Sequence, residues 1–238
     1  MLDTPALLVE DLVVSYGRLE VVRGVSIRVR AGTVVALIGG NGAGKSTVLN
    51  AIAGLVQPQG GRVVFGDRDI TGWPAYRVAR AGLVIVPQGR QMIAPLTVKE
   101  NLEMGAYIRN DGEIAGDIKR MFMRFPRLGE RRSVRAGFLS GGEQQVLAIA
   151  RAMMSRPKLI VMDEPSVGLS PGMLDEVFGI VRDIASSGVP VLVVEQNAIK
   201  AMDVSDFCYV LQTGKIAHSG PSAELKNDPR IISAYLGY

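Results

Sequence analysis

The sequence has one cysteine among its 238 residues. Cys208 lies inside the apolar run "FCYVL", so an internal disulfide is excluded and a reducing compartment is favoured. We expect Cys208 to be a buried packing residue and not a reactive thiol. The single histidine, His218, lies in "IAHSG" near the C-terminus and is expected at the surface.

Long hydrophobic runs are also missing, because no apolar stretch approaches the ~18 residues that a helix needs to span a bilayer. The N-terminus carries Asp3 and lacks a basic start followed by an apolar segment, which argues against a signal peptide. The formal net charge is only +4. We therefore expect a soluble protein without a nucleic-acid partner, whose 47% of hydrophobic residues suffice for a buried core.

The order of apolar segments predicts an α/β fold with a mainly parallel sheet. Strands at 7–15 and 21–29 form an expected N-terminal β layer, and helix and strand patterns alternate from residue 140 onward. The whole chain, 1–238, is expected to be one domain, with a helical subdomain inserted at about 97–140. The other expected elements are a strand within 33–39, a helix from about 45, a short helix at 74–81 beginning with proline, a strand at 83–86, helical structure at 97–125, helices at 140–155 and 171–185, a helix from 198, and strands ending at 163, 195 and 212.

The segment "LSGGEQQ", residues 139–145, places two glycines at a predicted helix start. Ser140 and Glu143 fit a capping box, in which each side chain bonds a backbone N–H near the other residue. That leaves Gly141 and Gly142 unexplained, since a glycine at a helical position costs about 0.5 to 1 kcal/mol relative to alanine. Because bare amides at a helix start attract anions, we interpret the glycines as part of a phosphate site.

The segment "GGNGAGKST", residues 39–47, matches the phosphate-loop pattern G-x-x-x-x-G-K-[ST] between a predicted buried strand and an amphipathic helix. Its glycines allow successive backbone N–H groups to point at a phosphate, Lys45 supplies a positive charge, and the Ser46 hydroxyl is a Mg²⁺ ligand. A glycine-rich turn that carries "GKS" by chance is the weaker alternative.

The strand "LIVMD" ends in Asp163, and Glu164 follows directly. Ligands of open α/β sheets bind at the carboxyl ends of the strands, which places Asp163 near the metal and Glu164 toward the γ-phosphate. There Glu164 can act as the general base that polarises water. Acidic residues that merely end a strand are the alternative, which fits poorly in a chain with a phosphate loop.

The three motifs in this order resemble those of the ATP-binding cassette (ABC) ATPases, and the likeness covers nearly the whole chain. The resemblance implies a P-loop NTPase core that binds ATP and Mg²⁺. It also implies that the phosphate loop of one chain and the signature segment, residues 139–145, of another hold the same ATP. The residues that it implies for nucleotide binding are Tyr16, Gly39, Asn41, Gly42, Ala43, Gly44, Lys45, Ser46, Thr47, Gln88, Ser140, Gly141 and Gly142, and those for the metal are Ser46, Gln88 and Asp163.

Individual positions carry over from the family to different degrees. Tyr16 in "VSYG" corresponds to the aromatic residue that stacks on adenine, although a tyrosine at a strand end is as often a packing residue. Gln88 matches the glutamine that senses Mg²⁺, but alone it reads as a polar loop residue. Ser170 stands where many relatives have aspartate, in the loop 166–170, which matches the family's loop that contacts the partner.

The largest departure from the family is Gln196, because many relatives have histidine there. Glutamine can bond a phosphate or orient water, but it cannot carry a proton at neutral pH. The expected catalytic residues are therefore Glu164 as the base, Lys45 on the phosphates and Gln196 as a positioning group.

Four stretches, "PQGR", "DEPSVGLSP", "VEQN" and "SAYLG", resemble the ATPase subunits of bacterial importers for leucine, isoleucine and valine, while similar ATPases serve urea or other amides. The resemblance implies two membrane permeases, a periplasmic or extracellular solute-binding protein, and a second ABC ATPase chain, with a heterodimer favoured over a homodimer. It also implies a peripheral position on the cytoplasmic side of the membrane.

Two other classes of protein are alternatives to a transporter ATPase. Translation and DNA-repair ATPases use the same motifs, but they usually fuse two cassettes or insert a long coiled coil, and this chain has one motif set and no sustained heptads. A regulator without turnover would lack a carboxylate, and both are present. The run 119–135 reads as a solvated basic face, with lipid, permease or RNA contact as alternatives, and its basic residues are Lys119, Arg120, Arg124, Arg127, Arg131, Arg132 and Arg135.

Overall fold

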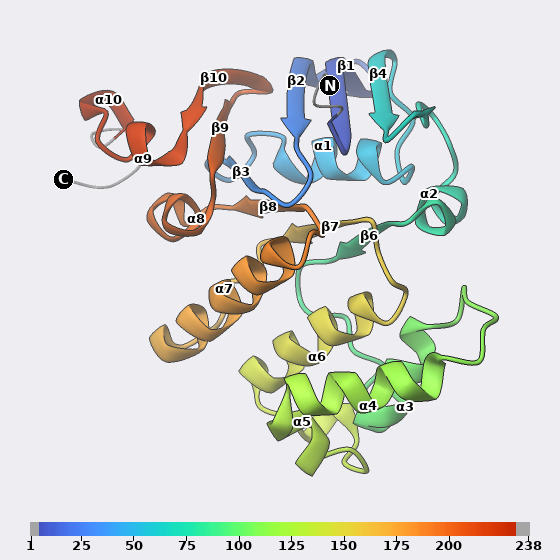
Figure 1. The fold of residues 1–238 in the computed structure, drawn as a ribbon. Coiled ribbons are helices and arrows are strands. Elements are labelled where there is room, and N and C mark those ends of the chain that lie inside the picture. The colour runs from blue at the N-terminus through green and yellow to red at the C-terminus, as the bar shows by residue number, and fades with distance from the viewer. Residues whose placement is uncertain (1–4, 232–238) are drawn as a thin grey trace.

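The computed structural model describes residues 5–231, so Asp3 and the "SAYLG" stretch lie outside the described residues. Its centre is a six-stranded sheet with the order β10-β9-β3-β8-β7-β6 (Figure 1). Every neighbouring pair is parallel except β9 and β10, which confirms the mainly parallel sheet. The strands are β3 Val34–Ile38, β6 Leu83–Val86, β7 Leu159–Asp163, β8 Val191–Glu195, β9 Phe207–Gln212 and β10 Lys215–Pro221.

The expected N-terminal β layer is a separate antiparallel sheet with the order β2-β1-β4-β5. Its strands are β1 Leu7–Tyr16, β2 Leu19–Val29, β4 Gly60–Phe65 and β5 Arg68–Asp69. Alternate residues of β1, such as Leu7 and Val9, are buried against the helix that follows the phosphate loop. Figure 1 shows that helix, α1 Lys45–Ile52, beneath these strands.

The central strands are almost wholly apolar because helices and the second sheet cover both of their faces. All residues of β3 and β8 are buried. Successive side chains point to opposite faces of the sheet. Val35 and Leu37 therefore pack in the cluster around α1, while Val34 and Val193 pack in the cluster that contains α6 Gly141–Met153 and α7 Pro171–Ser186.

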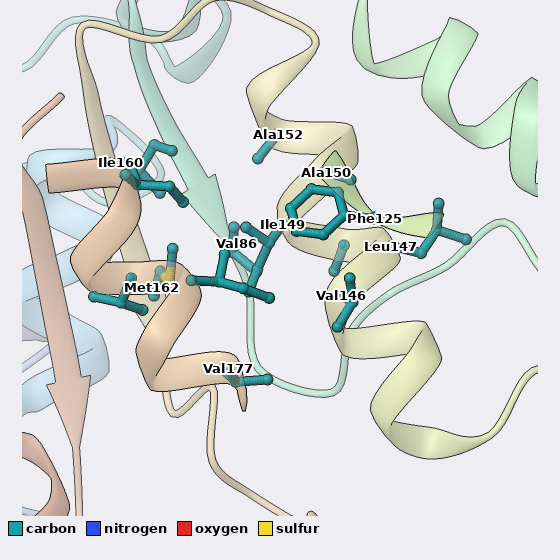
Figure 2. Close-up of a cluster of buried hydrophobic side chains, with 14 of the residues drawn as sticks. Val86, Phe125, Val146, Leu147, Ile149, Ala150, Ala152, Ile160, Met162 and Val177 are labelled. Atoms are coloured by element: carbon teal, nitrogen blue, oxygen red, sulfur yellow. The ribbon is translucent and has the colours of Figure 1, made fainter. Parts of the chain in front are cut away.

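The chain between β6 and β7 is helical and packs below the sheet (Figure 1). Figure 2 shows Val86 and Met162 of the sheet near Ile149 of α6 and Val177 of α7, and Phe125 belongs to the same buried cluster. The remaining helices are α2 Ala75–Ala81, α3 Val98–Gly105, α4 Ile114–Arg124, α5 Pro126–Glu130, a 3-10 turn at Ala136–Phe138, α8 Ala198–Val204, α9 Ser222–Leu225 and α10 Pro229–Ile231.

Three local expectations were wrong in detail. The helical stretch expected at 97–125 is divided, because "NDG" at 110–112 favours a turn between α3 and α4. Pro74 is the N-cap of α2 and does not lie inside the helix. His218 lies in β10, an antiparallel strand that was not expected, and is half-buried there. Cys208 is fully buried, as expected.

The basic run 119–135 contains residues with acidic partners on several helices. Arg131 pairs with Glu143 of α6 at 2.9 Å, and Arg127 lies 3.7 Å from Glu176 of α7. Arg120 pairs with Asp117 on its own helix. Within residues 5–231 no helix has the length and apolar character to cross a membrane.

Candidate active site

The phosphate loop, residues 39–47, connects β3 to α1. Gly44 is the N-cap of α1 with φ of 105°, a left-handed conformation that glycine adopts at little cost. It provides no side-chain cap, so the first amides of α1 remain available to an anion. Gly39 is required by its neighbour, since a Cβ there would lie 2.5 Å from the backbone oxygen of Leu211.

The remaining residues of the phosphate loop divide between the interior and the surface. Asn41, Gly42 and Ser46 are exposed, whereas Ala43 is buried and Thr47 is half-buried. The exposed residues therefore leave one side of the loop open to a ligand.

Lys45 is almost completely buried within the phosphate loop. Its Nζ donates hydrogen bonds to the backbone oxygens of Gly39 at 2.9 Å and Gly40 at 3.3 Å. The same nitrogen lies 3.3 Å from Oε1 of Glu164. The ammonium group is therefore held between the loop and the carboxylate expected to act as the base.

Glu164 connects the phosphate loop to Gln88. Its Oε2 accepts a hydrogen bond of 2.9 Å from Nε2 of Gln88. Its backbone has φ of 45°, an uncommon value for a residue with a side chain, and its N–H donates to the backbone oxygen of Val194 at 2.8 Å. The structure thus brings Lys45, Gln88 and Glu164 together.

Asp163 lies at the end of β7, and one of its carboxylate oxygens is buried. Oδ1 is buried and has no hydrogen-bond partner among the described residues. Burial, and then the nearby charge of Glu164, raise the pKa of Asp163. A buried carboxylate oxygen without a donor is unfavourable unless a cation or water completes the site.

A cleft of about 490 Å³ brings the three expected metal ligands to one surface, since Ser46, Gln88 and Asp163 all line it. One carboxylate, one hydroxyl and one amide oxygen suit Mg²⁺, which usually keeps several waters and takes only one or two carboxylates from the protein. The residues present therefore fit this ion.

The structure confirms the capping box expected in the signature segment. Ser140 is the N-cap of α6, its Oγ accepts from the Glu143 backbone N–H at 3.3 Å, and its own N–H donates to Glu143 Oε2 at 2.8 Å. Burial would raise the pKa of Glu143, but bonds from Ser140 and the charge of Arg131 lower it overall.

The two glycines of the signature segment have neighbours that the sequence argument did not include. A Cβ on Gly142 would lie 2.8 Å from Met173 Sδ, and one on Gly141 would lie 2.9 Å from Arg90 Nη1. Packing against Arg90 and Met173 therefore limits the size of the side chain at both positions, whether or not a phosphate binds there. These neighbours could not be read from the sequence because they lie far away along the chain.

The structure does not join every expected site residue. Within residues 5–231, no hydrogen bond or ion pair links Ser140 to the phosphate loop. Tyr16, at the end of β1, is 49% exposed. Gln196 is exposed directly after β8 and makes no side-chain hydrogen bond to a described residue. One chain thus presents its nucleotide-binding and signature parts separately.

Sequence reasoning missed Glu195, which is 1% exposed at the end of β8. Its two oxygens accept from the backbone N–H of Ser166 at 2.9 Å and from Ser166 Oγ at 2.8 Å. Burial raises the pKa of Glu195, while these bonds oppose the shift. An acidic residue ending an apolar run was the available signal, and here the carboxylate anchors the loop 166–170.

A sequence profile described as "ABC transporter" matches residues 22–167 of the chain. The ADP conformation of MJ1267, described as an ATP-binding cassette of an ABC transporter, superposes with a TM-score of 0.88 and 31% identity over 98% of this chain and 99% of that one. The P-loop α/β fold expected from the motifs is therefore confirmed.

Two curated relatives bear on the kind of transporter. The chain is 41% identical to the high-affinity branched-chain amino acid transport ATP-binding protein BraG of Pseudomonas aeruginosa, over 93% of this chain and 95% of the relative. It is 35% identical to the lipopolysaccharide export system ATP-binding protein LptB of Acidithiobacillus ferridurans, over 96% and 95% respectively. The chain therefore belongs to the ABC transporter family and is an ATP-binding subunit with ATPase activity.

Proposed function

We propose that the chain is the ATP-hydrolysing subunit of a bacterial importer for the branched-chain amino acids leucine, isoleucine and valine. The observation that carries this proposal is its 41% identity to BraG over nearly the full length of both proteins. An importer ATPase for urea or another amide remains the alternative within the same group. The likeness to LptB favours a second candidate, a subunit of an export system.

The contacts around Lys45 support a division of roles for hydrolysis. The amides at the start of α1 and the Lys45 ammonium bind the phosphates, since the helix start has no side-chain cap and the Lys45 ammonium lies within the same loop. Glu164, held by Gln88 at 2.9 Å, accepts a proton from the attacking water. Gln196 positions that water or the terminal phosphate.

The cleft beside Asp163 supports binding of Mg²⁺ with the nucleotide. Ser46, Asp163 and Gln88 would hold the ion, because they line one cleft and Asp163 Oδ1 has no other partner among the described residues. When bound, Mg²⁺ supplies positive charge to the phosphate oxygens.

The separation of Ser140 from the phosphate loop within one chain supports closure of a two-chain assembly. A shift from mostly open to mostly closed requires ATP to favour the closed form by a factor of about 10⁴, or ~5.5 kcal/mol. Because the assembly has two sites, each ATP supplies about half of that energy. Charge-assisted hydrogen bonds from Ser140 and the Gly142 amide to a partner's γ-phosphate contribute ~1.5 to 3 kcal/mol each. Hydrolysis removes that phosphate and reopens the assembly. The second chain is a different ABC ATPase or a copy of this one.

Permease docking is supported by an apolar groove of about 240 Å³ that is lined by β6, the end of α3 and α6. The helical segment 97–140, which contains α3, is proposed to be the inserted subdomain. Burial lowers the pKa of Arg151 in this groove, and no carboxylate within residues 5–231 pairs with it. A permease segment with an acidic side chain fits this surface. The groove lining includes Ile85, Pro87, Ile93, Met104 and Arg151. We propose that the docked chain lies on the cytoplasmic side of the membrane.

Transport itself tests the proposed substrate. We expect the chain, assembled in proteoliposomes with the permeases of its transporter and their solute-binding protein, to drive ATP-dependent uptake of labelled leucine. Uptake of urea without leucine would contradict the branched-chain proposal and support the alternative importer. Copurification of the chain with ribosomes or DNA in place of membrane subunits would contradict both.

Ser140→Arg tests the role of the signature segment. We expect ATP affinity of the single chain to change less than about twofold, because no hydrogen bond or ion pair among the described residues links Ser140 to the phosphate loop, while ATP-driven dimerisation and hydrolysis are lost. Nucleotide titration and light scattering measure the two effects. Loss of ATP binding itself would show that the two roles are not divided between chains.

A further inference from the structure

Arg90 lies in the Gln88 loop, defined as residues 87–91. Three consecutive residues of this loop, Gly89, Arg90 and Gln91, have φ of 76°, 67° and 41°. The Gln91 N–H donates to the Gly89 backbone oxygen at 2.7 Å, which closes a tight turn centred on Arg90. Two adjacent residues with side chains in the left-handed region are held there only by surrounding contacts.

The guanidinium of Arg90 lies between two other segments. Its Nη2 is 3.3 Å from the backbone oxygens of both Val167 and Gly168, to which it donates. Its Nη1 is 2.9 Å from the position that a Cβ on Gly141 would occupy. One half-buried side chain therefore contacts the loop 166–170 and the start of α6.

Arg90 does not satisfy its charge through an ion pair. No carboxylate within residues 5–231 lies within ion-pair distance of its guanidinium, and its acceptors are neutral carbonyl groups. Arginine offers several donors in a planar fork, so it can bridge two carbonyl groups while lying flat against a glycine. A lysine ammonium at the same position lacks that planar fork.

The Gln88 loop connects the two separated parts of the site. Gln88 donates to Glu164 beside Lys45, and Arg90, two residues later, donates to the loop that follows Glu164. We propose that Arg90 is a positioning residue that couples the nucleotide site of its own chain to the surface formed by residues 166–170 and the start of α6. That this surface meets the partner's nucleotide rests on the proposed function.

The same contact explains the glycine at position 141. Any side chain there would meet the far end of Arg90, at 2.9 Å from Nη1 and 3.1 Å from Nη2. The guanidinium would then have to shift, and its bonds to the carbonyl groups of Val167 and Gly168 depend on its present position. Gly141→Ala therefore displaces the guanidinium without removing it.

The experiment uses the full chain and the variants Arg90→Gln and Arg90→Lys. Hydrogen exchange at the amides of Val167 and Leu169, which donate to Glu164 and Ser166, reports the order of the loop. We expect Arg90→Gln to raise this exchange and to lower kcat for ATP by about tenfold each, which corresponds to about 1.4 kcal/mol, with ATP affinity within about twofold. Arg90→Lys should recover less than half of either loss.

Two further variants keep the result interpretable. Arg80→Gln, on the exposed face of α2, removes an arginine elsewhere and should behave as the unchanged protein. Gly141→Ala should raise hydrogen exchange at Val167 and Leu169 as Arg90→Gln does. It replaces Arg90→Gln as the test if that variant does not fold. Unchanged exchange and kcat in Arg90→Gln would overturn the proposal, as would full recovery by lysine or a loss of ATP affinity parallel to kcat.

The proposed function can fail separately from the role of Arg90. The rate per chain should rise with protein concentration if two chains close one site. A rate per chain independent of concentration and unaffected by Ser140→Arg would contradict closure between two copies of this chain, while the exchange at Val167 and Leu169 still decides whether Arg90 positions the loop.

Discussion

Glu164→Gln is expected to lower the rate of ATP hydrolysis by about 10³-fold or more, within the range for removal of a general base. Glutamine keeps the shape of the side chain and still offers an oxygen to Gln88 Nε2, now 2.9 Å from Glu164 Oε2. It cannot accept a proton from water. ATP binding and closure should therefore persist, and the closed form should accumulate.

The measurement compares steady-state phosphate release with ATP affinity and with the dimer fraction in ATP. Gln196→Ala is the comparison variant, because the positioning role proposed for Gln196 transfers no proton and its side chain makes no hydrogen bond to Glu164 in the described chain. It should lose much less activity than Glu164→Gln. A Glu164→Gln protein that turns over ATP at the original rate would refute the assignment of the base.

Lys45→Met is expected to weaken ATP binding by about 100-fold, or ~3 kcal/mol, because it removes charge-assisted hydrogen bonds to the phosphates. Methionine fills a similar buried volume, so the loss reflects the missing charge more than a cavity. The substitution also removes the cation 3.3 Å from Glu164. Hydrolysis should fall with binding.

Calorimetric titration with ATP measures this effect. Lys158→Met, an exposed lysine before β7 and away from the phosphate loop, is the control and should bind ATP normally. Retention of tight ATP binding by Lys45→Met would show that the backbone amides of the loop suffice. That result would remove Lys45 from the binding site but leave Glu164 untouched.

The sequence predicted those parts of the fold that short-range patterns determine. Apolar runs such as "LIVMD" gave buried strands, and Ser140 with Glu143 gave a capping box, because each depends on residues within one element. The turn at 110–112 and the strand that contains His218 were missed. The turn residues "NDG" interrupt a stretch whose composition is otherwise helical. The exposed strand β10 forms because its backbone pairs with β9.

Contacts between distant segments could not be predicted in the same way. Glu195 holds Ser166, and Arg90 meets Gly141 and the carbonyl groups of Val167 and Gly168, although these segments are separated by many residues. Arg90 lies in "PQGR" and Glu195 in "VEQN", but neither stretch indicates these contacts. Their roles depend on which loops meet at the carboxyl ends of the strands.

By itself, the sequence determined the chemistry of the chain: a glycine-rich loop with Lys45 and Ser46, carboxylates at 163 and 164, and a capped helix start at Ser140. These are local patterns whose geometry follows from a few consecutive backbone angles. Only the tertiary structure decided that Gln88 and Lys45 meet at Glu164 and that one oxygen of Asp163 has no hydrogen-bond partner among the described residues. Such distances depend on the order of strands in the sheet, which packing of the whole chain sets.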